Sequence, residues 1–369
     1  MIPFNFKRFV RPDIEEMEPY IPIVPFDVLS EQLGRSPANI TKLDANENPY
    51  GPSPAALDAI ATGNWYHIYP DPESNALRKA LSNYWGVPME RLLVGMGADE
   101  LIDLILRALL STGDGVVNCP PSFGMYPFST AVNGGHIINV HRREDFSLDI
   151  ESIVSEVASH PEAKVLFICS PNNPDGSTIS EGDLVRLLDL PLLLVLDEAY
   201  IEFAEVDEQK SHYLWALKHD NLVILRTFSK LAGLAGLRVG YGIFPDWLLP
   251  QLWKIKQPYN VNVAASLAAM ASLNNPDWMK DKVKLIVKER ERMVSELVSF
   301  EFLEPYPSHA NFVLFRVKGR TAAQLKQDLA QEGVLVRYFD KPGLTNCIRI
   351  SAGRSVDTER LIEALHKVA

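Results

Sequence analysis

Lys230 is the residue of this chain best suited to covalent chemistry. It lies in the segment TFSKLAGLAGLRVGY (227–241), directly after an apolar run. A lysine can form a Schiff base with an aldehyde cofactor, and burial can lower the pKa of its amine so that the free base reacts. A surface lysine opening a helix would also explain Lys230 taken alone, so the choice depends on its neighbours.

The residues around Lys230 are suited to a phosphate group. Thr227 and Ser229 carry hydroxyls, the glycines that follow allow close approach of the backbone, and Arg238 comes eight residues after Lys230. Hydroxyls, the positive end of a helix and a guanidinium together suit a phosphate dianion. A solvated helix position is the alternative for Arg238, but its neighbours in this Gly-rich stretch are apolar.

Asp197 ends another apolar run, LPLLLVL, and begins the motif DEAY. A carboxylate at the end of a buried strand needs a cationic or donor partner. A protonated pyridine nitrogen is such a partner, and its protonation makes the ring an electron sink. Tyr200, three residues on, could donate to an oxygen on that ring. A helix cap for Asp197 and a packed core position for Tyr200 are the structural alternatives.

Two turns offer weaker signals. Asn173 lies in SPNNPDG (170–176), where a tight turn can direct its amide into a pocket. Ala98 and Asp99 follow Gly97 at the start of a predicted helix, where free backbone N–H groups can bind phosphate. Turns of this composition are common, so neither signal stands alone.

Three apolar runs are predicted to position these groups. Ala163–Cys169, Leu190–Leu196 and Asn221–Arg226 have the pattern of parallel strands buried on both faces, and each is followed at once by polar residues. Ligands of open α/β sheets lie beyond the carboxyl ends of the strands. We therefore expect one pocket at the edge of an α/β fold whose mostly parallel central sheet is covered by helices.

The rest of the pattern divides the chain into regions. Residues 1–40 form a Pro-rich arm assigned to the small domain, residues 41–275 the large domain, and residues 276–369 a smaller C-terminal α/β domain that opens with a long charged helix. The net charge of −11 argues against a nucleic-acid partner. Three unpaired cysteines, no metal-ligand spacing, no membrane span and no targeting segment predict a cytoplasmic protein without a metal.

In these motifs the chain resembles the fold-type I aminotransferases, which depend on pyridoxal 5′-phosphate, and closely the histidinol-phosphate aminotransferase family. The resemblance covers nearly the whole chain. The motifs that carry it are LDANENPYGPSP (43–54), YPDPES (69–74), GMGADELIDL (95–104), CPPSFGMY (119–126), SPNNPDG (170–176), DEAYIEF (197–203), TFSKLAGLAGLRVGY (227–241), PYNVN (258–262), NFVLFRV (311–317), GVLVRYF (333–339) and IRISAG (348–353).

The resemblance implies a role for each site residue. Lys230 matches the Schiff-base lysine, which also moves the proton, and Asp197 the partner of the pyridinium. The other cofactor residues that it implies are Asn173 and Tyr200 at the ring oxygen, Thr227, Ser229, Arg238, Ala98 and Asp99 at the phosphate, Phe123 stacked on the ring in place of the usual tyrosine, and Tyr69 reaching the cofactor phosphate of a second subunit, which implies a homodimer with shared sites.

Substrate binding is expected at Tyr20, Asn46, Arg337 and Arg349. The family's C-terminal arginine, here Arg349, binds a carboxylate, and a second arginine with a tyrosine suits a phosphate dianion. Surface exposure of Arg337 and simple packing of Tyr20 are the alternatives. Asp175 departs from the family's turn, which usually has threonine.

The implied reaction converts L-histidinol phosphate and 2-oxoglutarate to imidazole-acetol phosphate and L-glutamate, a step of histidine biosynthesis. An aromatic aminotransferase or a threonine-phosphate decarboxylase would use the same scaffold and cofactor. A regulatory module that binds the cofactor as a signal is disfavoured, because only a short Pro-rich arm precedes the matching region.

Overall fold

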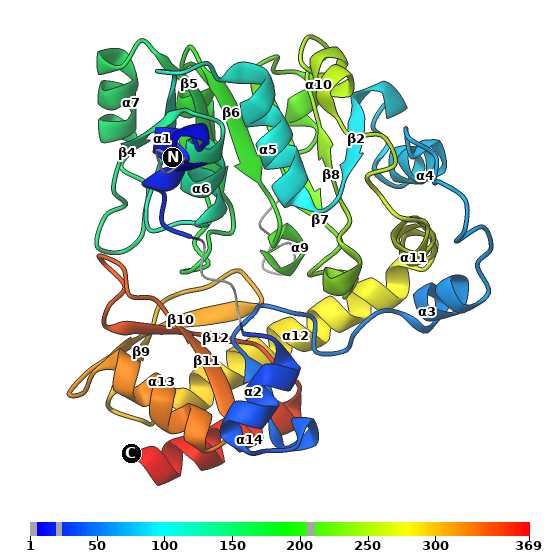
Figure 1. Cartoon of the computed structure of the whole chain (residues 1–369). Coiled ribbons are helices and arrows are strands. Elements are labelled where there is room, and N and C mark those ends of the chain that lie inside the picture. Colours follow the sequence, from blue (N-terminus) through cyan, green and yellow to red (C-terminus); the bar gives the residue numbers. More distant parts are fainter. Residues whose placement is uncertain (1–5, 20–23, 205–210) are drawn as a thin grey trace, which may run out of the picture.

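Two β-sheets organise the chain, and the long helix α12 (Pro276–Leu297) runs past both of them (Figure 1). The structure, a computed structural model, describes residues 6–19, 24–204 and 211–369. One sheet has seven strands and the other has five. None of the described helices is long and apolar enough to cross a membrane.

The seven-stranded sheet has the order β2-β8-β7-β6-β5-β3-β4. Six strands are parallel, and only β8 runs antiparallel to its neighbours β2 and β7. The prediction of a mostly parallel α/β sheet is confirmed. The strands are β2 (Leu92–Gly95), β3 (Gly115–Asn118), β4 (His136–Asn139), β5 (Ala163–Cys169), β6 (Leu193–Asp197), β7 (Leu222–Thr227) and β8 (Gly240–Ile243).

Helices cover both faces of this sheet because successive strand residues point to opposite sides. Val195 packs into one core with α5, α6 and α10, while the adjacent Leu196 packs into another with α4, α7, α8 and α11. Burial on both faces explains the near-continuous apolar runs. The helices are α3 (Pro54–Ala61), α4 (Asn75–Trp85), α5 (Ala98–Leu109), α6 (Met125–Val132), α7 (Ile150–Ser159), α8 (Glu181–Leu188), α9 (Ile201–Ala204), α10 (Leu249–Ile255) and α11 (Val263–Leu273).

The predicted strand Leu190–Leu196 is shifted toward its C-terminal end. The observed β6 begins at Leu193, and Leu190 still donates to the carbonyl of Leu187 at the end of α8. Pro191 lies between the helix end and the strand and has no N–H for a strand ladder. Asp197 is therefore the last residue of the strand rather than the first residue after it.

The five-stranded sheet has the order β1-β11-β12-β10-β9, with only β1 and β11 parallel. Helices α12, α13 and α14 pack on one face through a core that includes Val313 and Ile350. The opposite face carries Phe312 and Leu314 of β10, and faces the large sheet. The elements are β1 (Thr41–Leu43), β9 (Leu303–Pro305), β10 (Phe312–Val317), α13 (Ala322–Gln331), β11 (Val334–Tyr338), β12 (Cys347–Ser351) and α14 (Ser355–Val368).

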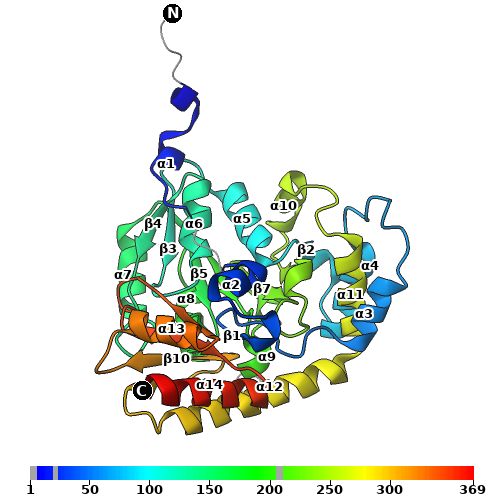
Figure 2. The same ribbon diagram turned by 60° about the horizontal axis from the view of Figure 1, so that its bottom comes forward.

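The described part of the N-terminal arm divides between the two sheets. Arg11, just before α1 (Pro12–Glu15), donates to the carbonyl of Val132 in α6, beside the large sheet. After α2 (Phe26–Leu33), Arg35 donates to the carbonyl of Gln331, beside the small sheet (Figure 2). The strand β1, just inside the region that we assigned to the large domain, pairs with β11 of the small sheet.

Candidate active site

Three segments that carry predicted site residues leave the same edge of the large sheet. β5, β6 and β7 are adjacent and parallel, with Cys169 paired to Asp197 and Asp197 to Leu225. Asn173 follows β5, Asp197 ends β6, and Lys230 lies three residues past β7. This edge faces the five-stranded sheet in Figure 1. The structure thus brings the three polar clusters together, as expected from the strand ends.

Asp197 is buried, and its described contacts are with neutral donors. The hydroxyl of Tyr126 donates to Oδ2 at 2.8 Å, and the backbone N–H of Ala199 donates to Oδ1 at 3.0 Å. Burial raises the pKa of Asp197 to about 6, although both hydrogen bonds favour the carboxylate. No basic side chain among the described residues forms an ion pair with it. A cation beside this carboxylate would remove a large desolvation cost.

Tyr126 was not predicted as a site residue. It is fully buried in α6, and its ring stacks on Phe167 of β5 with centroids 4.7 Å apart. Burial also raises the pKa of Tyr126, so its hydroxyl remains protonated and donates to Asp197. The available signal was its place in the motif CPPSFGMY, three residues after Phe123. Only the packing of α6 shows that its hydroxyl meets the carboxylate.

The amine of Lys230 is close to backbone carbonyl and aromatic groups. Nζ donates to the carbonyl of Ala45 at 3.3 Å and lies 5.8 Å from the ring centroid of Tyr200. Burial, assisted by the positive charge of Arg349, lowers the pKa of Lys230 to about 8. Such an amine is partly neutral at physiological pH, as a nucleophile and proton carrier requires.

The candidate phosphate residues meet at the start of α5. Thr227 donates to Ser229 Oγ at 2.9 Å, and its own Oγ accepts from the Ser229 N–H at 3.0 Å. Arg238 pairs with Asp99 at 3.0 Å, so the arginine lies beside the first turn of this helix. The first N–H groups of a helix have no intrahelical partner and carry the positive end of its dipole.

Two glycines, Gly97 and Gly240, allow the start of α5 to approach Arg238 and β8 closely. A Cβ at Gly97, where φ is +81°, would lie 2.6 Å from a guanidinium nitrogen of Arg238. A Cβ at Gly240 would lie 2.8 Å from the Ala98 nitrogen and 2.9 Å from the Arg226 carbonyl. The sequence thus leaves room for backbone N–H groups and a guanidinium to converge on an anion. The N–H groups at the start of α5 and the Arg238 guanidinium suit a phosphate. Asp197, which has no ion pair with the described residues, suits a protonated pyridine nitrogen.

Asn46 and Tyr200 connect the two sheets. Asn46 Nδ2 donates to the Tyr200 hydroxyl at 3.2 Å, and Asn46 Oδ1 accepts from Ser351 Oγ of β12 at 3.1 Å. The Asn46 backbone N–H also donates to Ser351, and its carbonyl accepts from Asn311. Asn46 therefore lies within the predicted site, but its polar groups are already engaged by the protein. Its contacts indicate that it orients Tyr200.

Arg337 and Arg349 lie opposite each other on β11 and β12. Arg349 donates to Asn173 Oδ1 at 2.5 Å and to the Asp44 carbonyl at 2.8 Å. Arg337 is partly buried and lies over the ring of Phe339, with no hydrogen bond or ion pair to the described residues. The structure thus joins Asn173 to Arg349, a predicted substrate residue, which was not expected from the sequence.

Phe123 and Asp175 are the two positions where the sequence was expected to depart from the pattern of the family that it resembles. Phe123 packs edge-on to Tyr126, with centroids 5.6 Å apart, which places it beside the Asp197 partner. Asp175 is buried, accepts from the Asn172 amide, and accepts from the Ser177 N–H at 2.8 Å. Asp175 therefore holds the turn that carries Asn173 rather than contacting the pocket.

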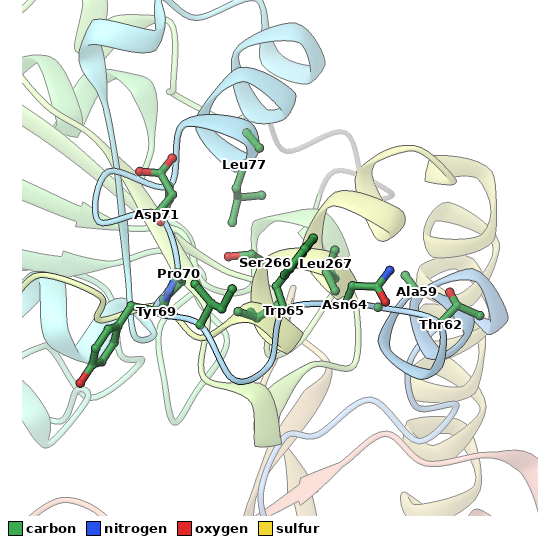
Figure 3. A pocket seen from close by; sticks show the side chains of 15 residues that line it. Ala59, Thr62, Asn64, Trp65, Tyr69, Pro70, Asp71, Leu77, Ser266 and Leu267 are labelled. Carbon is green, nitrogen blue, oxygen red and sulfur yellow. The ribbon is translucent and has the colours of Figure 1, made fainter.

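The described contacts of Tyr69 are with none of the other predicted residues. Its ring stacks on Tyr259 with centroids 4.7 Å apart, and it is 79% exposed. It borders a hollow of about 700 Å³ between α3, α4 and α11, and points away from the hollow's other labelled side chains (Figure 3). Tyr20, expected to bind substrate, lies outside the described residues.

Comparison with known proteins assigns a family to this site. Residues 38–367 match the class I and II aminotransferases. The chain is 51% identical to the chloroplastic histidinol-phosphate aminotransferase of Nicotiana tabacum, covering 97% of this chain and 86% of that protein. It is 49% identical to the histidinol-phosphate aminotransferase of Roseiflexus castenholzii, covering 100% of both.

A solved structure has the same fold. The histidinol-phosphate aminotransferase of Sinorhizobium meliloti, in complex with pyridoxal 5′-phosphate, superposes with a TM-score of 0.87 at 29% identity, covering 99% of each chain. Full-length coverage means that both sheets and their connections are shared, together with the strand ends that carry the candidate site. The chain therefore belongs to the class I and II aminotransferases, and within them to the histidinol-phosphate aminotransferase family.

Proposed function

We propose that this enzyme transfers the amino group of L-histidinol phosphate to 2-oxoglutarate, giving imidazole-acetol phosphate and L-glutamate in histidine biosynthesis. One observation carries the proposal. Asp197, a buried carboxylate with no ion pair to the described residues, and Lys230, whose pKa is lowered, lie at adjacent strand ends, facing the sheet that carries Arg337 and Arg349. The relatives named as histidinol-phosphate aminotransferases over the full length support the choice of substrate.

The residues fit pyridoxal 5′-phosphate as the cofactor. When bound, it supplies an aldehyde that bonds to amines and a pyridine ring that draws electrons from the bonds to the donor's Cα. Asp197 would hold the protonated ring nitrogen, and Phe123 would pack on the ring. The groups that would hold its oxygens are Asn173 and Tyr200 at the ring oxygen, and Thr227, Ser229, Arg238 and the N–H groups of Ala98 and Asp99 at the phosphate.

Lys230 acts as the proton carrier of the reaction. Lowering its pKa from 10.5 to about 8 raises the neutral fraction at pH 7.5 from about 0.1% to about a quarter. Nζ in its neutral form can take the proton from Cα of the amino donor and give it back later in the reaction. The Tyr200 ring beside this amine limits the positions that it can adopt.

The arginine pair binds the anionic ends of both substrates. Histidinol phosphate presents a phosphate ester, and glutamate presents two carboxylates, so each brings a charge that two guanidinium groups can share. Arg349 is held by Asn173 and Asp44, whereas Arg337 has no carboxylate partner among the described residues. Tyr20 would add a hydroxyl from the arm.

The active form is a homodimer that shares its sites. Exposed aromatic and aliphatic side chains gather around the hollow in Figure 3, with Trp65 65% and Tyr69 79% exposed. Exposed apolar side chains that gather at one place on a surface are typical of a protein interface. A second copy packed there would cover it, and Tyr69 would reach the cofactor phosphate of that copy.

The remaining assignments follow from the same architecture. Residues 41–275 form the large domain and residues 276–369 the small domain. The end of the arm at Arg35 and the strand β1 add to the small domain, whereas the part of the arm at Arg11 packs beside the large sheet. The enzyme works in the cytoplasm, where its three buried free cysteines remain reduced.

A half-reaction screen tests the function. Purified enzyme loaded with pyridoxal 5′-phosphate is mixed with L-histidinol phosphate, L-phenylalanine or O-phospho-L-threonine, and conversion of the cofactor to its aminated form is followed by absorbance. We expect the highest kcat/KM with histidinol phosphate, and no turnover in Lys230→Ala. Preference for phenylalanine, or carbon dioxide release from phosphothreonine, would overturn the assignment.

A further inference from the structure

The two substrate arginines face each other across neighbouring strands. Arg337 of β11 pairs in register with Arg349 of β12, so both side chains leave the same face of the small sheet. Like charges directly opposite each other in a sheet are destabilising. The neighbouring strand residues Val336, Ile348 and Ile350 face the opposite core, which fixes the arginines on the face toward the large sheet.

Phe339 contacts both guanidinium groups. Its ring centroid lies 5.5 Å from the guanidinium carbon of Arg337 and 5.4 Å from that of Arg349, both within the range of a cation–π interaction. The negative face of an aromatic ring attracts a cation without neutralising it. Phe339 can therefore hold two like charges near each other and leave their N–H groups to an anion.

The two arginines depend on Phe339 to different degrees. Arg349 is also held by Asn173, by the Asp44 carbonyl and by the ring of Phe312, 5.2 Å away. Arg337 has Phe339 as its one partner among the described residues. Loss of the Phe339 ring would therefore release Arg337 first.

Phe339 is itself anchored from both sheets. It packs on a small core formed by Leu314, Leu344 and Cys347 of the small-sheet region and by Phe146, which comes from the loop after β4. Phe146 has a positive φ of 65°, and its carbonyl accepts from Arg142 at 2.9 Å. The position of the ring is thus defined by the contact between the two sheets.

The geometry points to Phe339 as a positioning residue that orients Arg337, and secondarily Arg349, toward the anionic group of each substrate. This inference rests on the proposed function, because the arginines are substrate ligands only in that reaction. Phe339 touches no reacting atom in it. Its loss should weaken the binding of anions while leaving the proton transfers at Lys230 intact.

Steady-state kinetics of Phe339→Leu and Phe339→Tyr, with holoenzyme, test the inference. Leucine keeps the apolar volume and removes the ring, whereas tyrosine keeps the ring. For Phe339→Leu we expect KM for L-histidinol phosphate and for L-glutamate to rise about tenfold, with kcat within about twofold of the native value. Inorganic phosphate should inhibit this variant correspondingly more weakly. Phe339→Tyr should restore native KM values.

Phe302→Leu is the matched control, because Phe302 makes a similar contact to Arg320, 5.9 Å away, and is part of the small-sheet core on the other face. It should leave KM and phosphate inhibition unchanged. Unchanged KM in Phe339→Leu, or an equal rise in both leucine variants, would overturn the inference. Native enzyme that does not turn over histidinol phosphate would instead overturn the proposed function.

Discussion

The hydrogen bond from Tyr126 to Asp197 favours the charged carboxylate and so opposes the effect of burial on its pKa. Tyr126→Phe removes only the hydroxyl, since the ring remains stacked on Phe167 and edge-on to Phe123. The lost donor lies 2.8 Å from Oδ2 and favours the charged form of the acid. Its removal must therefore raise the pKa of Asp197.

The size of this change follows from the energy of the bond. A hydrogen bond to a charged group contributes about 1.5–3 kcal/mol, and one pKa unit corresponds to about 1.4 kcal/mol. The lower figure moves the pKa of Asp197 from about 6 to about 7. At pH 7 the ionised fraction then falls from about nine-tenths to about a half. Less carboxylate is available to keep a ring nitrogen protonated.

The pH dependence of the affinity for pyridoxal 5′-phosphate measures this shift, because it reports the ionisations of the cofactor-free protein. We expect the acid limb of the profile to move up by about one pH unit in Tyr126→Phe. Tyr241→Phe is the matched control, since that buried hydroxyl accepts from Trp85 at 2.7 Å, outside the site. An acid limb in Tyr126→Phe that coincides with the native one would refute this account of Asp197.

Two other substitutions test the stability and the shape of the site. Asp197→Asn should raise the unfolding free energy of the cofactor-free protein by about 2–3 kcal/mol at pH 8 in urea titrations, because burial raises the pKa of the native acid from 3.8 to about 6. This gain should vanish below about pH 3, where the acid is neutral in both states; a gain that persists there would contradict the assignment. Gly240→Ala should weaken the binding of pyridoxal 5′-phosphate at least about tenfold in absorbance titrations, because the added Cβ would meet backbone atoms at 2.8 and 2.9 Å. Gly236→Ala, which has open space around its Cβ, should bind the cofactor normally, and equal affinities in the two variants would contradict the close-approach argument.

The parallel core could be predicted because its strands are buried on both faces. Continuous apolar runs in β5, β6 and β7 do not depend on distant contacts, so their positions could be read to within a few residues. The antiparallel strand β8 was not predicted, because GYGI alternates glycine with larger residues and gives no strand pattern. Its glycines are required by contacts with α5 and β7 that exist only in the folded chain.

The sequence was enough to predict which residues belong to the site, but not which of them contact one another. Lys230 and Asp197 followed from strand ends, whereas the Tyr126 hydroxyl reaches Asp197 across 71 positions of sequence. The register that sets Arg337 opposite Arg349 likewise depends on how β11 and β12 align. Asn46 was assigned to substrate from the motif alone, and its contacts with Tyr200 and Ser351 could be seen only once the sheets were assembled.

The folded chain holds the carboxyl group of Asp197 and the amine of Lys230 in surroundings that disfavour their charged forms. Burial raises the pKa of Asp197 to about 6 and lowers that of Lys230 to about 8, so between these values both groups are charged at a cost to stability. A structural role would have selected a partner for each, as Glu198 and Arg226 provide for one another in the same region. These opposed shifts at adjacent strand ends are explained if a bound ring brings a cation to Asp197 and an aldehyde to Lys230.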